Sequence, residues 1–334
     1  MMSGEDITIN NVSLTFHGQV PPQGRVYKSD EGDEAVITYS EVTGSVFGSL
    51  KTRDGKSFAL EKCHYGQVWI EFDIEIFESM QEPDYGEPVQ VEANKFIPSN
   101  SDTSTATATV SIIVYYTPEF REATADIQGF VNQVIAETNQ GYANSQIPLV
   151  AEVFCIKEAH VRDIPHNGLQ VLWNFSRMLG TVRALRNSAD IAILLVSRAN
   201  ICGVAPLIHS IPSRKNYALV AKGCALGYYT FGHEIGHLFG GAHNREVHSF
   251  NAAFLYGHGH HIQNGYRSIM AYSNPSHRIR INHYSNPDVS FEGNPTGTWK
   301  SNNAKVIIDN RFAMAASGGE ERKKICQLTG DTIF

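Results

Sequence analysis

A histidine-rich stretch from His233 to His243 constrains the fold of this 334-residue chain more than any other segment. It reads His-Glu-x-x-His-x-x-Gly-x-x-His. His233 and His237 are four residues apart, so on a helix they lie on the same face. Two neutral imidazoles in that position can bind one Zn²⁺ ion. The stretch therefore predicts a helix that carries two ligands of a single zinc ion.

The third histidine requires the helix to end before it. His243 follows His237 by six residues, which on a continued helix would turn it by about 240° to the wrong face. Gly240 can end the helix, because glycine accepts a positive φ and is common just after helix ends. We expect the turn to bring His243 back as the third ligand. Glu234 lies next to the first ligand and can act as a general base toward a water on the metal without being a ligand itself.

Three protein ligands and one water are typical of a catalytic zinc site and not of a closed structural one. The alternative is a set of unrelated core histidines. Five fixed residues at this spacing arise by chance in such a chain with a frequency on the order of 1 in 10,000, so the pattern favours zinc.

The stretch resembles the signature of the metzincin metallopeptidases. A second segment, Arg267–Ser273, resembles their Met-turn, with its methionine 27 residues after His243. The resemblance implies that Met270 forms an apolar floor under the three histidines. It also implies that Tyr272 binds zinc or hydrogen-bonds the transition state. The residue after the third histidine, often Asp in the reprolysin group, is Asn244 here, which leaves the subfamily open.

Residues 110–320 are expected to form the catalytic domain, followed by a short tail at 321–334. Hydrophobic periodicity predicts strands at 110–116, 149–156 and 191–196 and helices at 119–142 and 169–185. Alternating strands and helices before the zinc helix predict an α/β sandwich. Four short segments resemble the reprolysin-like and peptidyl-Asp metallopeptidase branch: 114–118, 138–142, 202–205 and 284–287. The expected fold class is an α/β (α+β) metzincin-like domain with a mixed sheet and a long active-site helix, preceded by a small β-rich domain.

The β-rich domain is predicted at 1–97, from short alternating runs at 35–39 and 68–72 and hairpin signals between 44 and 56. Residues 98–109 are polar and of low complexity, which predicts a linker accessible to an activating cleavage. Residues 1–108 hold 18 acidic and 7 basic residues, a net charge of −11, whereas 109–334 hold 16 and 20, a net charge of +4. Opposite charges fit a propeptide docked on its enzyme as an inhibitor, and they also fit two unrelated solvated surfaces. By its position, the region resembles a propeptide.

The chain has five cysteines. Four lie in the expected catalytic domain and its tail, and they can form two disulfides in any of three connectivities. We favour Cys202–Cys224, which would tether the segment before the zinc helix, and Cys155–Cys326 follows by default. Cys63 could be a thiolate that caps the zinc and keeps the enzyme latent. The alternatives are a buried apolar cysteine at this position and an acidic residue of the N-terminal domain as the cap.

Two further groups of side chains surround the Met-turn. Arg267, Arg278 and Arg280 flank it, where metzincins shape the pocket for the residue after the scissile bond, so an arginine would favour an acidic side chain. Solvated surface arginines are the alternative. Four histidines follow the third ligand, and they predict either a second metal site or a histidine-rich surface loop: His248, His258, His260 and His261.

Composition and motifs limit the classes of partner that this chain can bind. There is no basic run or nucleic-acid reader motif, and no apolar run approaches the 18 residues of a membrane span. No signal peptide is visible, yet the cysteines favour an oxidising compartment, so we expect a secreted protein. The expected partners are protein or peptide substrates, paired with an edge strand near 198–207. Two functions remain: a zinc endopeptidase made as a latent zymogen, and a catalytically silent zinc-binding scaffold.

Overall fold

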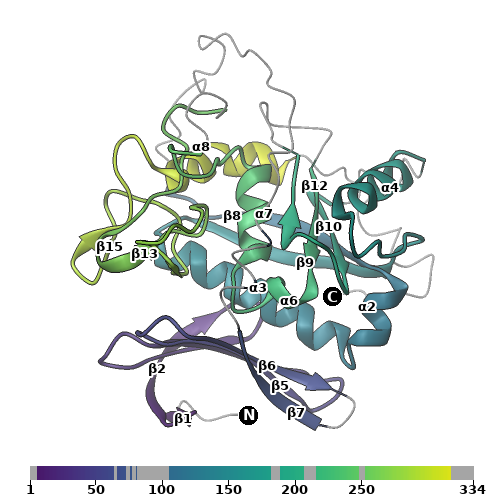
Figure 1. The fold of residues 1–334 in the computed structure, drawn as a ribbon, viewed down its shortest axis with the longest axis horizontal. Helices are drawn as coiled ribbons and strands as arrows, with labels where there is room; N and C mark the ends of the chain where they lie inside the picture. Colours follow the sequence, from purple (N-terminus) through teal and green to yellow (C-terminus); the bar gives the residue numbers. More distant parts are fainter. Residues whose placement is uncertain are drawn as a thin grey trace.

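The computed structural model describes residues 6–63, 66–72, 76, 80, 105–181, 189–206, 216–247 and 253–316. Two large β-sheets, two short two-stranded sheets and the surrounding helices form the regular structure of the described residues (Figure 1). The architecture is mixed α/β with a β-rich N-terminal region, as the sequence predicted.

The N-terminal sheet is an antiparallel meander, in which strands adjacent in sequence are adjacent in the sheet. Its strands are β1 (Ile7–Ile9), β2 (Val12–Val20), β3 (Gly24–Lys28), β4 (Glu34–Tyr39), β5 (Val46–Lys51), β6 (Ser57–Cys63) and β7 (Gly66–Glu71). The predicted strands and hairpin fall in β4, β7 and β5–β6, which confirms them. Residues 81–97 of the predicted domain lie outside the described residues.

The second sheet has the order β11-β12-β10-β8-β9 and is parallel except for its edge strand β11, so it is mixed, as predicted. Its strands are β8 (Ala108–Tyr116), β9 (Leu149–Glu158), β10 (Ile191–Val196), β11 (Gly203–Val204) and β12 (Tyr217–Ala221). Alternate residues of β8 face opposite sides, as a period of two requires. Ile112 and Val114 pack into one core and Ile113 and Tyr115 into another.

Helices cover both faces of this sheet. They are α2 (Pro118–Ala123), α3 (Ile127–Asn144), α4 (Gly168–Thr181), α6 (Lys222–Ala225), α7 (Thr230–Leu238) and α8 (Asn303–Ala315). The core on one side contains residues of α3, α7 and α8, and the core on the other side contains residues of α4. Short strands β13 (Tyr266–Arg267), β14 (Ile279–Arg280), β15 (Ser290–Phe291) and β16 (Asn294–Pro295) follow α7.

Helix α3 lies between the two sheets (Figure 1). Gln133 shows how closely it packs on the N-terminal sheet. Its amide accepts a hydrogen bond from Oγ1 of Thr38 at 2.7 Å and donates one to the carbonyl of Val36 at 2.7 Å. A Cβ added at Gly129 would lie 2.2 Å from the ring of Phe47, so glycine at that position admits the ring. The N-terminal sheet thus packs directly on α3, a helix that covers one face of the second sheet.

Two predicted boundaries are wrong. The single helix expected at 119–142 is two helices, α2 and α3, because Asp126 starts a new helix by accepting a hydrogen bond from the Gly129 amide at 2.8 Å. The predicted linker ends earlier than expected, because Ala108 and Thr109 already belong to β8. Residues 98–104 of the linker and the tail at 321–334 lie outside the described residues.

Candidate metal centre

Helix α7 presents two of the three histidines. It begins after Tyr229, whose backbone is left-handed with φ of 63°, and it ends at Leu238. Gly240 has φ of +96°, and the next two backbone bonds, Gly240 N to His237 O and Gly241 N to Gly236 O, are 2.9 Å each. This pair of bonds is the Schellman ending that favours glycine. The helix therefore ends where the sequence predicted, although its nine residues make it shorter than the long helix expected.

The turn brings the third histidine back to the first two. The Nε2 atoms of His233, His237 and His243 lie 2.9–3.2 Å from one another. These three side chains are the group of potential metal ligands found among the described residues, and all are buried. Nδ1 of His233 faces the Ile269 carbonyl at 2.8 Å, and Nδ1 of His237 faces the Gly241 carbonyl at 2.7 Å.

This donor set fits a metal ion. A carbonyl opposite Nδ1 requires a proton there, which leaves the Nε2 lone pair free to bind. Tetrahedral bonds of 2.0–2.1 Å would put neighbouring nitrogens about 3.3 Å apart, close to the spacing of His233, His237 and His243. Converging lone pairs at this spacing repel one another unless a cation lies between them.

Glu234 lies beside these ligands, between α7 and the sheet edge. Its side chain is fully buried. A Cβ added at Gly203, on the edge strand β11, would lie 2.3 Å from its Oε1 atom and 2.8 Å from Cγ2 of Thr230. The carboxylate thus occupies space that only a glycine in β11 leaves open.

The Met-turn lies under α7 and beside the third histidine. A Cβ added at Gly236 would lie 2.5 Å from Sδ of Met270, which is fully buried. The ring of Tyr272 packs on His243, with ring centroids 3.9 Å apart and planes at 35°. Met270 thus packs against α7 and Tyr272 against the third histidine, while the roles that the resemblance implied for them stay predictions.

One of the two predicted disulfides is present among the described residues. Cys202 and Cys224 form a disulfide. Cys155 is also disulfide-bonded, and its predicted partner, Cys326, lies outside the described residues. Cys63 is a free, partly exposed thiol at the end of β6. It is not part of the ligand group around the three histidines, so the structure does not place it as the latency ligand.

Two of the three arginines are buried and contact one tyrosine. Arg267 donates to the Tyr228 hydroxyl at 3.0 Å and to the Ala271 carbonyl at 2.6 Å. Arg280 donates to the Tyr228 carbonyl at 3.0 Å, and its guanidinium lies 4.4 Å from the centre of that ring. The alternative of solvated arginines is therefore wrong for these two, whereas Arg278 is exposed.

The histidines after the third ligand do not form one surface loop. His258 is buried, and its Nδ1 faces the His243 carbonyl at 3.0 Å, so it supports the third ligand's backbone. His260 and His261 are half-buried, and His248 lies outside the described residues. Among the described residues, no second group of potential ligands converges as the first does. The sequence pattern alone did not distinguish the supporting role of His258.

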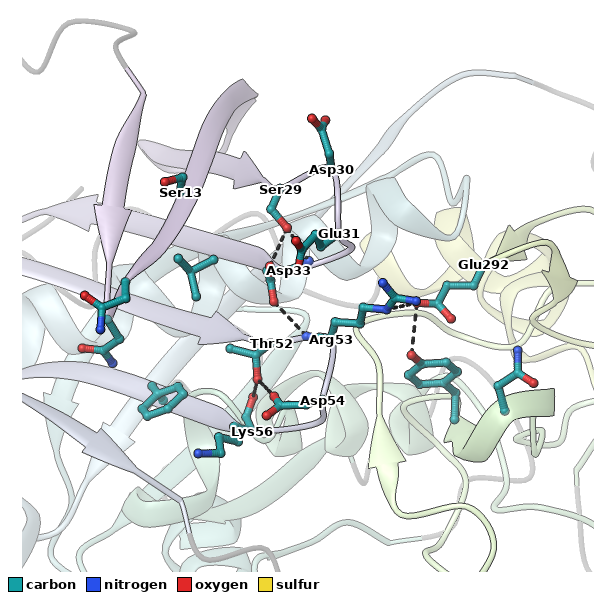
Figure 2. Close-up of a pocket in the computed structure, with 16 residues that line it drawn as sticks. Ser13, Ser29, Asp30, Glu31, Asp33, Thr52, Arg53, Asp54, Lys56 and Glu292 are labelled. Atoms are coloured by element: carbon teal, nitrogen blue, oxygen red, sulfur yellow. Dashed lines mark hydrogen bonds and ion pairs between the residues drawn. The ribbon is translucent and has the colours of Figure 1, made fainter.

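The large crevice in Figure 2 lies elsewhere, at the junction of the N-terminal sheet and the segment 264–292. Its volume is about 1060 Å³. Its polar groups bind one another: Ser29 with Asp33, the Arg53 amide with Asp33 at 2.9 Å, and Arg53 with Glu292 at 3.8 Å. None of the three histidines lines it, so it is part of the contact between the two regions and not the metal centre.

Buried imidazoles that converge on one point, beside a buried glutamate and an open sheet edge, define a metal-dependent peptidase of the metzincin kind.

No helix among the described residues is both long and apolar enough to cross a membrane.

Comparison with known proteins supports the assignment to the metallopeptidases. The profile of metallopeptidase family M12 matches residues 106–285, and the chain belongs to this family. It is therefore a metalloendopeptidase.

Three relatives are named peptidyl-Asp metalloendopeptidase. The one from Stenotrophomonas maltophilia (strain K279a) is 29% identical over 306 residues, covering 86% of this chain and 72% of the relative. The one from Xanthomonas campestris pv. campestris is 31% identical over 222 residues, covering 64% and 53%. The one from Pseudomonas fragi is 36% identical over 116 residues, covering 34% and 73%.

A chain in a solved chaperone–substrate complex is similar in fold, with a TM-score of 0.50 at 15% identity. The match covers 83% of this chain but only 40% of the chain in the complex, which is therefore matched over less than half of its length.

Proposed function

We propose that the protein is a zinc endopeptidase in which His233, His237 and His243 hold the ion and Glu234 is the general base. The convergence of three Nε2 atoms within 3.2 Å, next to a buried carboxylate, carries this proposal. Zinc at such a site supplies a Lewis acid that polarises the water and the scissile carbonyl. Glu234 accepts the proton of the attacking water and delivers it to the leaving amine. Tyr272 donates a hydrogen bond to the oxygen that becomes negative.

The edge strand β11 is the proposed substrate platform. It is antiparallel to β12 and ends the sheet, so it offers backbone groups to an extended peptide. It lies against Glu234, because Gly203 leaves the space for that carboxylate. A peptide paired with β11 would thus pass directly over the general base.

An acidic residue after the scissile bond is the proposed preference. Three relatives are named for peptidyl-Asp cleavage. In this chain, Arg280 is buried, and its Nε has no hydrogen-bond partner among the described residues. Burial is the main cause that lowers the pKa of Lys51 to about 7, and the charges of Arg267 and Arg280 contribute to this lowering, so positive charges lie near one another beside Arg280. A substrate carboxylate would satisfy such a buried guanidinium.

Arg280→Gln tests this preference. We expect kcat/KM for peptides with Asp after the cut bond to fall by roughly 100-fold, because a bidentate charged partner is lost. Peptides with Ala at that position should be cleaved as before. Arg278→Gln is the matched control, since it removes an exposed arginine two residues away. An equal loss on both substrates would exclude Arg280 as the specificity residue.

The N-terminal region is proposed to keep the secreted enzyme latent. It packs on α3 through β4 and β5, and its Met80 carbonyl accepts a hydrogen bond from the Cys202 amide at 3.3 Å. Cys202 directly precedes β11, so this contact lies next to the proposed substrate platform. Met80 also packs against the Cys202–Cys224 disulfide and Tyr228. An activating cut must fall before Ala108, where β8 begins.

A mixed peptide library would test function and latency together. The chain cut within 98–104 and the uncut chain would be incubated with it, each with and without a zinc chelator. We expect chelator-sensitive cleavage by the cut chain alone. Equal cleavage by both forms would exclude latency. Absence of cleavage by either form, with one zinc bound per chain, would indicate the silent scaffold.

A further inference from the structure

The backbone of Tyr272 is held from two sides by side chains with no role in the proposed mechanism. On one side, the buried Asn244 accepts a hydrogen bond from the Tyr272 amide, 2.9 Å from N to Oδ1. The other end of the Asn244 amide donates to Oε2 of Glu246 at 2.8 Å. Glu246 accepts only, so it fixes the orientation of the amide and turns Oδ1 toward Tyr272.

On the other side, His261 faces the Tyr272 carbonyl, 2.9 Å from Nε2 to O. The Nδ1 atom of His261 faces Nδ2 of Asn274 at 3.2 Å. Because an amide NH₂ can only donate, Nδ1 of His261 is the acceptor from Asn274, and Nε2 donates to the Tyr272 carbonyl. The ring of His261 also stacks on His277, with centroids 4.6 Å apart and planes at 7°.

These two bonds connect the Met-turn to two segments that follow the third ligand. Asn244 is the residue after His243, whose ring packs on Tyr272 at 3.9 Å. We propose that Asn244 and His261 are positioning residues, which together hold Tyr272 in place against His243. The catalytic consequence rests on the proposed role of Tyr272. The Tyr272 clamp is the pair of hydrogen bonds between the backbone of Tyr272 and the side chains of Asn244 and His261, and this definition does not depend on that role.

Hydrogen exchange of the Tyr272 amide tests the clamp directly. It would be measured by NMR on the full chain with isotope-labelled tyrosine. Asn244→Leu removes the acceptor, so exchange should accelerate by about 10-fold, the equivalent of one hydrogen bond. Asn244→Asp combined with Glu246→Gln has nearly the same shape, keeps an acceptor oxygen for Tyr272 and exchanges the donor and acceptor of the Asn244–Glu246 bond, so exchange should stay at the wild-type rate. Equal exchange rates in the two variants would overturn the clamp, whatever the activity.

Kinetics test whether the clamp acts through Tyr272. Asn244→Leu and His261→Leu should lower kcat by about 10-fold or more, up to the loss caused by Tyr272→Phe. The Asn244→Asp, Glu246→Gln double variant and His261→Gln keep the required acceptor and donor and should stay within about 3-fold of wild type. In a Tyr272→Phe background, Asn244→Leu and His261→Leu should cause no further loss of kcat. An undiminished loss in that background would overturn the positioning role, and absence of metal-dependent cleavage by the wild type would instead refute the proposed function.

Discussion

The Cα atom of Gly203 lies so close to the carboxylate of Glu234 that an added methyl group would be 2.3 Å from Oε1. The two residues are 31 positions apart, one on the edge strand β11 and the other on α7. The proposed substrate platform and the proposed general base are thus in direct contact, and the position of one determines that of the other.

Gly203→Ala should therefore displace Glu234 while leaving the metal ligands in place. We expect kcat to fall by roughly 100-fold, since a shift of about 1 Å in a catalytic group can have that effect. The bound metal should remain at one ion per chain. Val204→Ala, the next residue of the same strand, is the control and should retain most activity. A Gly203→Ala variant with wild-type kcat would show that Glu234 tolerates the displacement.

The floor of the site depends on a second glycine. A Cβ at Gly236 would lie 2.5 Å from Sδ of Met270, so Gly236→Ala should overpack the core and destabilise the fold by about 1–3 kcal/mol. Met270→Leu nearly conserves volume and should cost less than about 1.5 kcal/mol. Thermal or denaturant unfolding of both variants measures this. The reverse order of stabilities would contradict the packing of Met270 under α7.

The disulfide between Cys202 and Cys224 should stabilise the segment that contains β11 and β12. It closes a loop with a sequence separation of 22 residues, for which chain entropy gives about 3 kcal/mol. A Cys202→Ser, Cys224→Ser double variant should therefore unfold at lower denaturant concentration. Cys63→Ser, which removes the free thiol, is the matched control and should leave stability and activity unchanged. Loss of latency in Cys63→Ser would instead support the thiol as a zinc cap.

The stability of the fold should depend on pH through Glu137 of α3, which contacts the N-terminal sheet through Ser49. Burial raises the pKa of this carboxyl to about 8, a rise supported by Glu34 and opposed by hydrogen bonds from Ser49 and the Gly227 amide. The folded chain then keeps a proton that the unfolded chain releases near its ordinary pKa of about 4.3. The stabilisation is complete below that value and is lost as pH rises toward 8.

Melting temperatures of the wild type and Glu137→Gln between pH 5 and pH 7 measure this effect. The wild type should lose stability relative to the variant as pH rises. The window stops at pH 7 because Lys51, with its pKa lowered to about 7, contributes the opposite trend above it. Parallel profiles for the two proteins would contradict the proposed titration of Glu137.

Short-range patterns made the ligands predictable. His233, His237 and Gly240 lie within one helix and its ending, where spacing alone determines the geometry. The break between α2 and α3 was missed because apolar spacing continues across it, whereas Asp126 starts a new helix by capping it.

Contacts between distant segments were beyond the reach of sequence patterns. The packing of Gly203 on Glu234 and the bond between Asn244 and Tyr272 join segments 28 or more residues apart. The sequence marked Asn244 only as a departure from a family pattern, and the structure shows which backbone group it binds. Likewise, nothing in the composition indicated that Glu137 would be buried beneath β5.

The most direct test of the central claim compares the wild type with Glu234→Gln, both cut within 98–104. Zinc content and peptide cleavage would be measured on the same samples, with and without chelator. We expect one zinc per chain in both proteins and chelator-sensitive cleavage by the wild type alone, because glutamine keeps the shape of Glu234 but cannot accept the proton. Cleavage by Glu234→Gln at the wild-type rate would contradict the assignment of Glu234 as the general base.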